Sequence, residues 1–303
     1  MTTGIHKIGS CVPGLLLRPI VFVLGIVCSC SAVASDLSER IDSILAGKRM
    51  TVGVAAEWGG GSFVHNDSLR FPLMSVFKTH VAMAVAARMK TDGFGPDSVV
   101  HIAKSRLLPG TYSPLRQKYP DRDVDITISE LLRYSVAESD NNACDVLIDI
   151  AGGADYVDMY IRSLGITGFS ISETEASMHE APASCRNNWS RPSSMLDVLK
   201  KIFEPGDNPF GLLREIMKGT VTGADKIRAG VPGGVPVAHK TGSSGRSDGV
   251  KTADNDAGVV FLPQGRCYVV VFIMDSAETD AENAAAIAAI TREIVAEASS
   301  ASR

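Results

Sequence analysis

The spacing of apolar residues divides the chain into strand-like and helix-like stretches. Leu37, Ile41 and Leu45 recur at helical spacing, and a strand-like stretch follows them, with a glycine-rich hairpin turn at residues 59–62. The pattern predicts helices over residues 36–46, 75–89, 127–135, 141–151, 154–164, 192–203, 211–217 and 277–296. It predicts strands over residues 50–58, 62–64, 235–241, 258–262 and 268–274.

The order of these elements predicts an α+β fold, an α/β sandwich with an added all-helical part. Hairpin-length links between the strands favour an antiparallel sheet made by both ends of the chain. Helices at both termini are expected to cover one face of that sheet. We therefore expect one catalytic domain at 35–303, with its α/β part at about 35–72 and 221–303 and its helical part at about 73–220. A small-molecule site is expected in a cleft between the two parts.

The first 34 residues have the three parts of a secretory signal peptide. His6, Lys7 and Arg18 form a mildly basic start, an apolar run covers 19–27, and small residues end at Ala34. The apolar run is too short to span a bilayer as a helix. Cleavage after Ala34 predicts secretion across the inner membrane into the periplasm, and lipid attachment at Cys30 is the alternative.

Charge and cysteine content exclude some classes of protein. With a net charge of −4, the chain lacks the excess of basic residues that is typical of nucleic-acid-binding proteins. After loss of the leader, Cys144, Cys185 and Cys267 remain, and this odd number does not indicate a disulfide framework. A bridge between Cys144 and Cys185 and three buried free thiols both remain open.

The first candidate for chemistry is Ser75-Val-Phe-Lys78, at the start of a predicted helix. A spacing of three places Ser75 and Lys78 on one helical face. A serine needs a neighbouring base to become a nucleophile, and a helix N-terminus favours developing negative charge. Alone, the pattern is weak, because a chain of this length holds about one such pattern by chance.

Two further motifs follow along the chain. Ser139-Asp140-Asn141 opens a predicted helix and, taken alone, is typical of an ordinary helix cap. Lys240-Thr241-Gly242 ends a predicted strand and, taken alone, is typical of a surface strand end with a turn glycine.

In this order, the three motifs resemble the S-x-x-K, S-D-N and K-T-G set of class A β-lactamases and penicillin-binding proteins. Glu175, in the loop-like stretch from Thr174 to His179, matches the glutamate by which class A enzymes differ from penicillin-binding proteins. The resemblance therefore implies a class A serine β-lactamase, a hydrolase of antibiotic resistance that inactivates penicillins and cephalosporins through a serine acyl-enzyme.

Several short stretches of the sequence are similar to those of the PER-like second subclass of class A. The stretches that carry this similarity are Thr174-Glu-Ala-Ser-Met-His179, Ala143-Cys-Asp145, Asn188-Trp-Ser190, Ala238-His-Lys-Thr-Gly242 and Asp275-Ser-Ala-Glu278. In that branch Asp145 and His179 each replace an asparagine of most class A enzymes, and Glu173 replaces an arginine that pins the loop neck of many. The loop that carries Glu175 must therefore be held in a different way.

The resemblance assigns the catalytic roles residue by residue. It implies Ser75 as the nucleophile, with Lys78, Glu175 through a water, or both as the base in acylation. It implies Ser139 as the proton donor to the departing nitrogen, and Glu175 as the group that positions the deacylating water. The backbone N–H groups of Ser75 and Ser243 form the implied oxyanion hole.

The resemblance also implies how the substrate is held. It assigns the substrate carboxylate to Lys240, Thr241 and Ser243, and the substrate amide to Asn141. Lys226 is the nearest match to an arginine that related enzymes place before K-T-G, with Arg228 and Arg246 as alternatives. No cofactor, metal or nucleic acid is implied, and a monomer is expected.

Three rival functions remain to be separated from this one. A DD-peptidase or penicillin-binding protein lacks the glutamate matched by Glu175, and a non-catalytic β-lactam sensor needs neither it nor fast deacylation. A metallo-β-lactamase is disfavoured, because the six histidines offer no H-x-H-x-D cluster.

Overall fold

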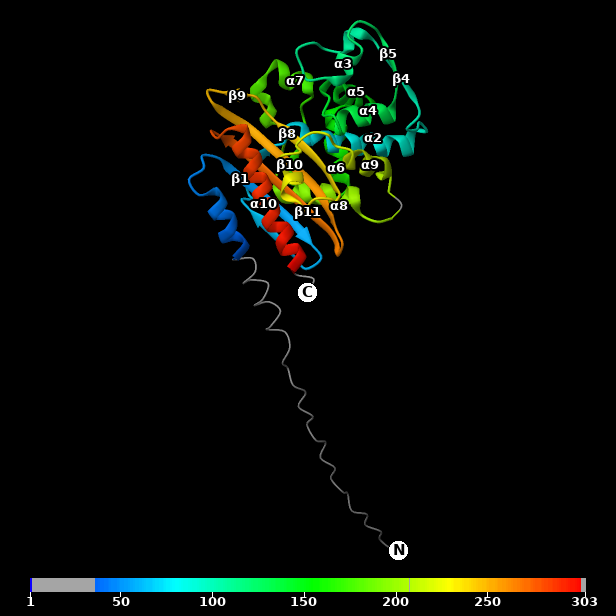
Figure 1. Cartoon of the computed structure of the whole chain (residues 1–303). Helices are drawn as coiled ribbons and strands as arrows, with labels where there is room; N and C mark the ends of the chain where they lie inside the picture. Colours follow the sequence, from blue (N-terminus) through cyan, green and yellow to red (C-terminus); the bar gives the residue numbers. More distant parts are fainter. Residues whose placement is uncertain (2–35, 207, 301–303) are drawn as a thin grey trace.

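The computed structural model describes residues 1, 36–206 and 208–300 (Figure 1). Apart from Met1, the predicted signal peptide, its cleavage point after Ala34 and the alternative lipid site at Cys30 lie outside the described residues. Within the described ranges, we find no helix with the length and apolarity needed to cross a membrane.

A single antiparallel sheet joins the two ends of the chain. Its strands lie in the order β2-β1-β11-β10-β8, and β9 pairs with the outer part of β10. Their bounds are β1 Thr51–Trp58, β2 Gly61–His65, β8 Val237–Ser243, β9 Arg246–Ser247, β10 Val250–Leu262 and β11 Gly265–Ser276. The α+β fold, the antiparallel pairing and the hairpin between β1 and β2 are confirmed.

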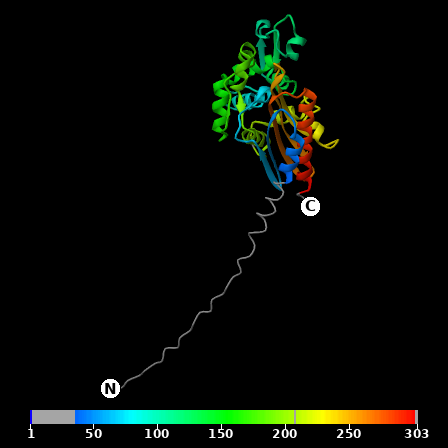
Figure 2. The same ribbon diagram turned by 90° about the vertical axis from the view of Figure 1, so that its left-hand side faces the viewer.

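Helices cover both faces of this sheet. The helix over 36–45 and α10 (Asp280–Ser300) share one face, where Leu37 and Ile41 pack with Ile287 and other buried residues of α10 and the strands. The other face packs on α8 (Pro192–Phe203) and the rest of the helical part. Figure 2 shows the two terminal helices on one side of the sheet and the green helices on the other.

The helical part is built around α2 (Lys78–Asp92), whose first nine residues are all buried. Its other helices are α3 Pro114–Lys118, α4 Ile128–Val136, α5 Asn141–Ala151, α6 Ala154–Ser163, α7 Glu175–Glu180 and α9 Gly211–Lys218. Short 3₁₀ helices are η1 Met74–Phe77, η2 Lys104–Arg106, η3 Pro182–Arg186 and η4 Ile227–Gly230. Two small sheets add β3 Phe71–Pro72, β6 Phe169–Ser170 and β7 Trp189–Ser190, and β4 Val99–Ile102 with β5 Val124–Thr127.

Three differences from the predictions concern residues around the predicted site. The stretch around Glu175, predicted as loop-like, is the short helix α7, which begins at a capping box between Thr174 and Ser177. Ser75 lies in the 3₁₀ turn η1, and the α-helix begins only at Lys78. Strand β10 begins at Val250 instead of residue 258, because the polar residues of its first half are buried and bonded within the fold.

The three described cysteines, Cys144, Cys185 and Cys267, are all buried and free, so the Cys144–Cys185 bridge is not formed. Burial raises the pKa of the Cys267 thiol to about 12 and that of the Cys144 thiol well above its usual range. Buried thiols with raised pKa values are protonated at neutral pH and react slowly.

We expect a thiol-specific reagent to titrate all three cysteines of protein lacking residues 1–34 after unfolding in urea, and to react far more slowly with the native protein. A reducing agent should leave the melting temperature unchanged. A single titratable thiol in the urea-unfolded protein, with a melting temperature that falls on reduction, would contradict the free-thiol state.

Candidate active site

The residue before Ser75 has an unusual backbone conformation. Met74 has φ +45°, which costs a non-glycine residue about 1 kcal/mol. The preceding peptide is fixed by a hydrogen bond of 2.8 Å from the Leu73 N–H to the Asn188 carbonyl oxygen. Ser75 therefore stands on a turn whose shape the surrounding structure imposes.

Lys78 is the centre of the site. Its side chain is fully buried, and Nζ donates to Ser75 Oγ at 2.7 Å and to Asn141 Oδ1 at 2.8 Å. Nζ also forms an ion pair with the Glu175 carboxylate. One ammonium group thus joins residues of η1, α5 and α7, which the sequence separates widely.

Lys240 is the second fully buried lysine of the site. Its Nζ donates to Ser139 Oγ at 2.8 Å and to the Thr241 carbonyl oxygen at 2.9 Å. Burial, and then the proximity of Lys78, hold the pKa of Lys240 well below its usual range. The two lysines are therefore coupled by their charges.

In the Ser139-Asp140-Asn141 motif, Asp140 has a structural role, whereas Ser139 and Asn141 contact the two buried lysines. Asp140 is the N-cap of α5 and accepts from the Ala143 N–H at 2.8 Å, and its carboxylate also bonds Ser113 and the Leu115 N–H. Ser139 has φ +62°, which turns the chain before the helix. As a result Ser139 and Asn141, on either side of the cap, reach Lys240 and Lys78 respectively.

Strand β8 runs directly against the turn that carries Ser75. An ideal Cβ added to Gly242 would lie 2.5 Å from the Leu73 carbonyl oxygen and 3.1 Å from the Ser75 nitrogen. Only glycine allows this approach, because a backbone atom cannot move aside as a flexible side chain can. The glycine of the K-T-G motif therefore brings the Ser243 end of β8 beside Ser75.

The segment around Glu175 is held by Asp145 of α5. The Asp145 carboxylate accepts the N–H of Glu175 at 2.7 Å and that of Ala176 at 2.8 Å, at the start of α7. Burial raises the pKa of Asp145 to about 6, in spite of these two donors.

Asn188 closes the other end of the segment. Its Oδ1 accepts the N–H groups of Ser172 and Glu173, and its Nδ2 donates to the Glu173 carbonyl oxygen. The Glu173 carboxylate accepts from Ser177 Oγ and Asn187 Nδ2. Hydrogen bonds to Asp145, Asn188 and Glu173 thus hold the segment, and a loop-neck arginine is not needed.

Lys226 does not join the other predicted site residues. Its Nζ pairs with the Asp254 carboxylate at 2.5 Å, in a buried position beside β10. Arg246 is bonded to Asp280 and to two carbonyl oxygens, and the Arg228 guanidinium lies 3.4 Å from the Thr220 carbonyl oxygen. Sequence reasoning missed Thr222, whose Oγ1 lies 2.7 Å from Thr241 Oγ1, because a single threonine in a loop carries no signal.

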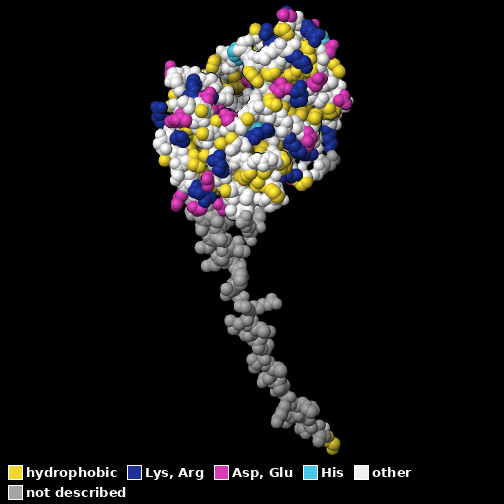
Figure 3. Space-filling view, viewed as in Figure 1, with side chains coloured by type: hydrophobic (Ala, Val, Ile, Leu, Met, Phe, Trp, Pro, Cys, Tyr) yellow, Lys and Arg dark blue, Asp and Glu magenta, His cyan; other side chains and the backbone are white. Residues whose placement is uncertain are grey.

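A cleft of about 440 Å³ lies between the sheet edge and the helical part, and the predicted site residues Asn141, Glu175 and Ser243 line it. Its walls include Met74, Tyr112, Asn141, Glu175, Cys185, Ser243 and Arg246. Figure 3 shows cationic and anionic side chains interspersed over the face of the molecule that is turned to the viewer.

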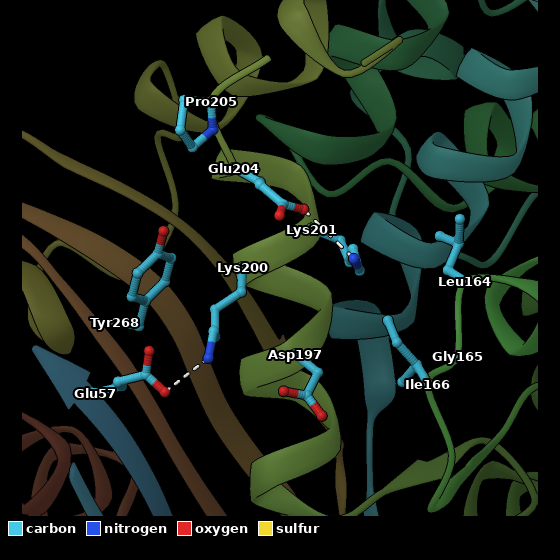
Figure 4. A pocket seen from close by; sticks show the side chains of 10 residues that line it. All are labelled: Glu57, Leu164, Gly165, Ile166, Asp197, Lys200, Lys201, Glu204, Pro205 and Tyr268. Carbon is cyan, nitrogen blue, oxygen red and sulfur yellow. Dashed lines mark hydrogen bonds and ion pairs between the residues drawn. The ribbon is translucent and has the colours of Figure 1, made fainter. Parts of the chain in front are cut away.

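A second cavity, of about 380 Å³, is shown in Figure 4. Its lining holds none of the motif residues, and its lysines are paired: Lys200 with Glu57 at 2.8 Å and Lys201 with Glu204 at 3.4 Å. The cleft with Glu175 is therefore the candidate active site.

Comparisons with known proteins agree with this choice. The model of the β-lactamase enzyme family matches residues 36–298. The chain is 48% identical over 266 residues to a β-lactamase of Bacteroides uniformis, covering 85% of this chain and 90% of the relative. It is 36% identical to the extended-spectrum β-lactamase PER-1 of Pseudomonas aeruginosa, covering 86% and 87%. A solved class A β-lactamase from Bacteroides cellulosilyticus is 42% identical, with a TM-score of 0.85 and coverage of 88% and 99%.

We expect Asp145→Ala to lower the free energy of unfolding by about 1–3 kcal/mol, because it leaves two backbone N–H groups at the start of α7 without an acceptor. Asp149→Ala is the matched control, since Asp149 lies on the same helix and pairs only at the surface with Arg106. Thermal and urea unfolding measure both variants. Equal stability of the two variants would contradict the role given to Asp145.

Proposed function

The chain belongs to the class A β-lactamases, and on this premise we propose that Ser75 is the nucleophile that opens the β-lactam ring. The protein is accordingly a serine β-lactamase, a hydrolase that inactivates β-lactam antibiotics and so gives resistance to them. The observation that carries the assignment of residues is the junction at Lys78, whose ammonium group contacts both Ser75 Oγ and the Glu175 carboxylate.

Acylation requires a base for the Ser75 hydroxyl proton. Lys78 contacts Ser75 Oγ directly, and Glu175 faces the same space and acts through a water. Lys78 acts as the base only after its ammonium group has given a proton to Glu175, with which it is paired, and Glu175 acts by taking the proton through a water. In either route the proton leaves Oγ while Ser75 Oγ bonds to the lactam carbonyl carbon. The carbonyl oxygen then carries the negative charge of a tetrahedral intermediate.

The oxyanion is held by the backbone N–H groups of Ser75 and Ser243. The tight packing of Gly242 on the Ser75 turn supports this assignment, because it brings the two backbone segments together. When the intermediate collapses, the C–N bond breaks and Ser139 protonates the departing nitrogen. The hydrogen bond from Lys240 to Ser139 Oγ supports this role, since it connects Ser139 to a proton reservoir with a lowered pKa.

The substrate carboxylate is bound at the end of β8 by Lys240, Thr241 and Ser243. Asn141 binds the acylamide, and its own Nδ2 is oriented by a 2.7 Å hydrogen bond to Thr111 Oγ1. Because Lys226 is already paired with Asp254, it acts indirectly, through that ion pair, and not by a direct contact with the carboxylate. Penicillins and cephalosporins both carry the carboxylate and the acylamide, and both are proposed substrates.

We expect Lys240→Met to lower kcat/KM for benzylpenicillin by at least about 100-fold, because it removes a charge-assisted contact to the substrate carboxylate. Lys226→Met should lower kcat/KM by less than about tenfold, because the Lys226 ammonium group is paired with Asp254 and does not contact the substrate, although loss of this buried pair should lower the stability of the protein. Steady-state kinetics at fixed ionic strength measure both. A loss in Lys226→Met as large as that in Lys240→Met would contradict the indirect role of Lys226.

Deacylation is assigned to Glu175. It is nearly buried and held on rigid backbone by Asp145, so that its carboxylate can orient a water toward the ester carbonyl of the acyl-enzyme. Water then adds, Ser75 leaves with a proton, and the opened product is released. This step distinguishes a hydrolase from a penicillin-binding protein or a β-lactam sensor, which stay acylated.

We expect Glu175→Gln to accumulate a penicilloyl adduct on Ser75, visible by mass spectrometry after mixing with benzylpenicillin, because the amide is a poor base. The control is Glu180→Gln, at the exposed end of the same helix α7, which should turn over as the parent does. Normal turnover by Glu175→Gln would remove Glu175 from the mechanism.

The remaining parts of the proposal concern the setting of the enzyme. We propose that it works in the periplasm as a monomer after removal of residues 1–34, and that hydrolysis persists in the presence of a chelator. The catalytic domain is 35–303, with its α/β part at about 35–72 and 221–303 and its helical part at about 73–220. The strands of the main sheet all precede residue 66 or follow residue 236, which supports this division.

A further inference from the structure

A buried asparagine connects the central sheet to the turn that carries Ser75. Asn255 lies in β10, is fully buried, and pairs in register with Gly242 of β8 and Phe272 of β11. Its Nδ2 donates to the Pro72 carbonyl oxygen at 2.7 Å and to the Leu73 carbonyl oxygen at 3.1 Å. Its Oδ1 accepts the Ile273 N–H at 3.2 Å. The side chain thus uses both its donors and its acceptor within the protein.

The hydrogen bonds of Asn255 act on the backbone just before Met74, the residue whose conformation determines the shape of the turn. The Leu73 peptide is held at its N–H by the Asn188 carbonyl oxygen and at its oxygen by Asn255. The next residue, Met74, keeps φ +45°, a conformation that a free chain would leave. The Asn255 amide therefore helps to hold the backbone that leads into Ser75 in a disfavoured shape.

The same carbonyl oxygen is the point at which β8 meets the turn. The Gly242 position packs against the Leu73 oxygen and the Ser75 nitrogen, and Gly242 is the register partner of Asn255. Any movement of the Leu73 peptide toward or away from the sheet changes the separation between Ser75 and the end of β8. That separation sets the distance between the N–H groups of Ser75 and Ser243.

We propose that Asn255 is a positioning residue for the oxyanion hole, which fixes the Ser75 N–H relative to the Ser243 N–H through the Pro72 and Leu73 carbonyls. The proposal rests on the function proposed above. Asn255 contacts neither substrate nor reacting atoms, so its effect is exerted on the geometry of the donors alone. A carboxamide suits this position because it donates to two carbonyl oxygens and accepts one N–H, which neither aspartate nor leucine can do.

The test compares acyl-enzymes in the Glu175→Gln protein, with and without Asn255→Ala. The readout is the stretching frequency of the ester carbonyl, measured by infrared difference spectroscopy with ¹³C-labelled and unlabelled substrate. A carbonyl held by two short hydrogen bonds absorbs at low frequency. We expect Asn255→Ala to shift the band to higher frequency and to reduce the acylation rate constant by at least about tenfold. The affinity for unreacted substrate should change little.

The matched control is Asn283→Ala in the same background. Asn283 is equally buried and bonds Ser276 and Asp254, but it lies in α10 and does not contact the Ser75 turn. It should lower the melting temperature without moving the carbonyl band. Asn255→Thr, which keeps one donor and suits a strand, should give a smaller shift than Asn255→Ala and serves if the alanine variant does not fold.

The outcomes separate the two proposals. An unshifted band and an unchanged acylation rate in both Asn255 variants would overturn the positioning role, even if stability falls. Failure of the parent Glu175→Gln protein to form an adduct would instead count against the assignment of Ser75 and Glu175. A band that shifts equally in Asn283→Ala would also overturn the proposal, because loss of stability alone would then explain it.

Discussion

The burial of two lysine ammonium groups is the constraint on which the rest of the site depends. An isolated charge in the protein interior costs several kcal/mol, so each ammonium group needs oxygen partners at fixed places. Lys78 has the Glu175 carboxylate and two side-chain oxygens. Lys240 has a hydroxyl and a carbonyl oxygen, and its lowered pKa reflects this poorer compensation together with the proximity of Lys78. The unequal environments suit two lysines that handle protons at different steps.

The two lysines lie in different parts of the chain, and Lys240 of β8 bonds Ser139 of the helical part. The complete site therefore exists only when the sheet and the helical part are packed together. The first half of β10 fixes the register of the sheet through three consecutive buried polar residues. Asp254 pairs with Lys226, Asn255 bonds the Ser75 turn, and Asp256 lies 3.0 Å from His239 Nδ1. Because each side chain has a particular partner, a shift of register in β10 would leave buried polar groups unsatisfied. The strand thereby fixes the position of the K-T-G motif in β8.

The segment that carries Glu175 illustrates how a different set of residues can meet the same requirement. A glutamate that orients a water needs a rigid backbone, and here Asp145 supplies two acceptors at the start of α7 while Asn188 closes the neck. The similarity to PER-1, at 36% identity, agrees with this branch of the family. The raised pKa of Asp145 shows that burial outweighs the two donors it binds. The Asp145 carboxyl that holds the Glu175 segment in place is therefore less readily ionised than an exposed aspartate.

The sequence by itself determined the family, the α+β order of elements and the motif residues, because these depend on local spacing and on the order of short patterns. Periodicity located α5 and α8 because each has a continuous apolar face. Only the tertiary structure decided the contacts of Lys226, Thr222 and Asn255, since their partners lie far away in the sequence or in irregular segments. For the same reason, the sequence did not reveal that β10 begins as early as Val250. Its polar residues have the pattern of a solvated loop, and only partners brought by folding make their burial favourable.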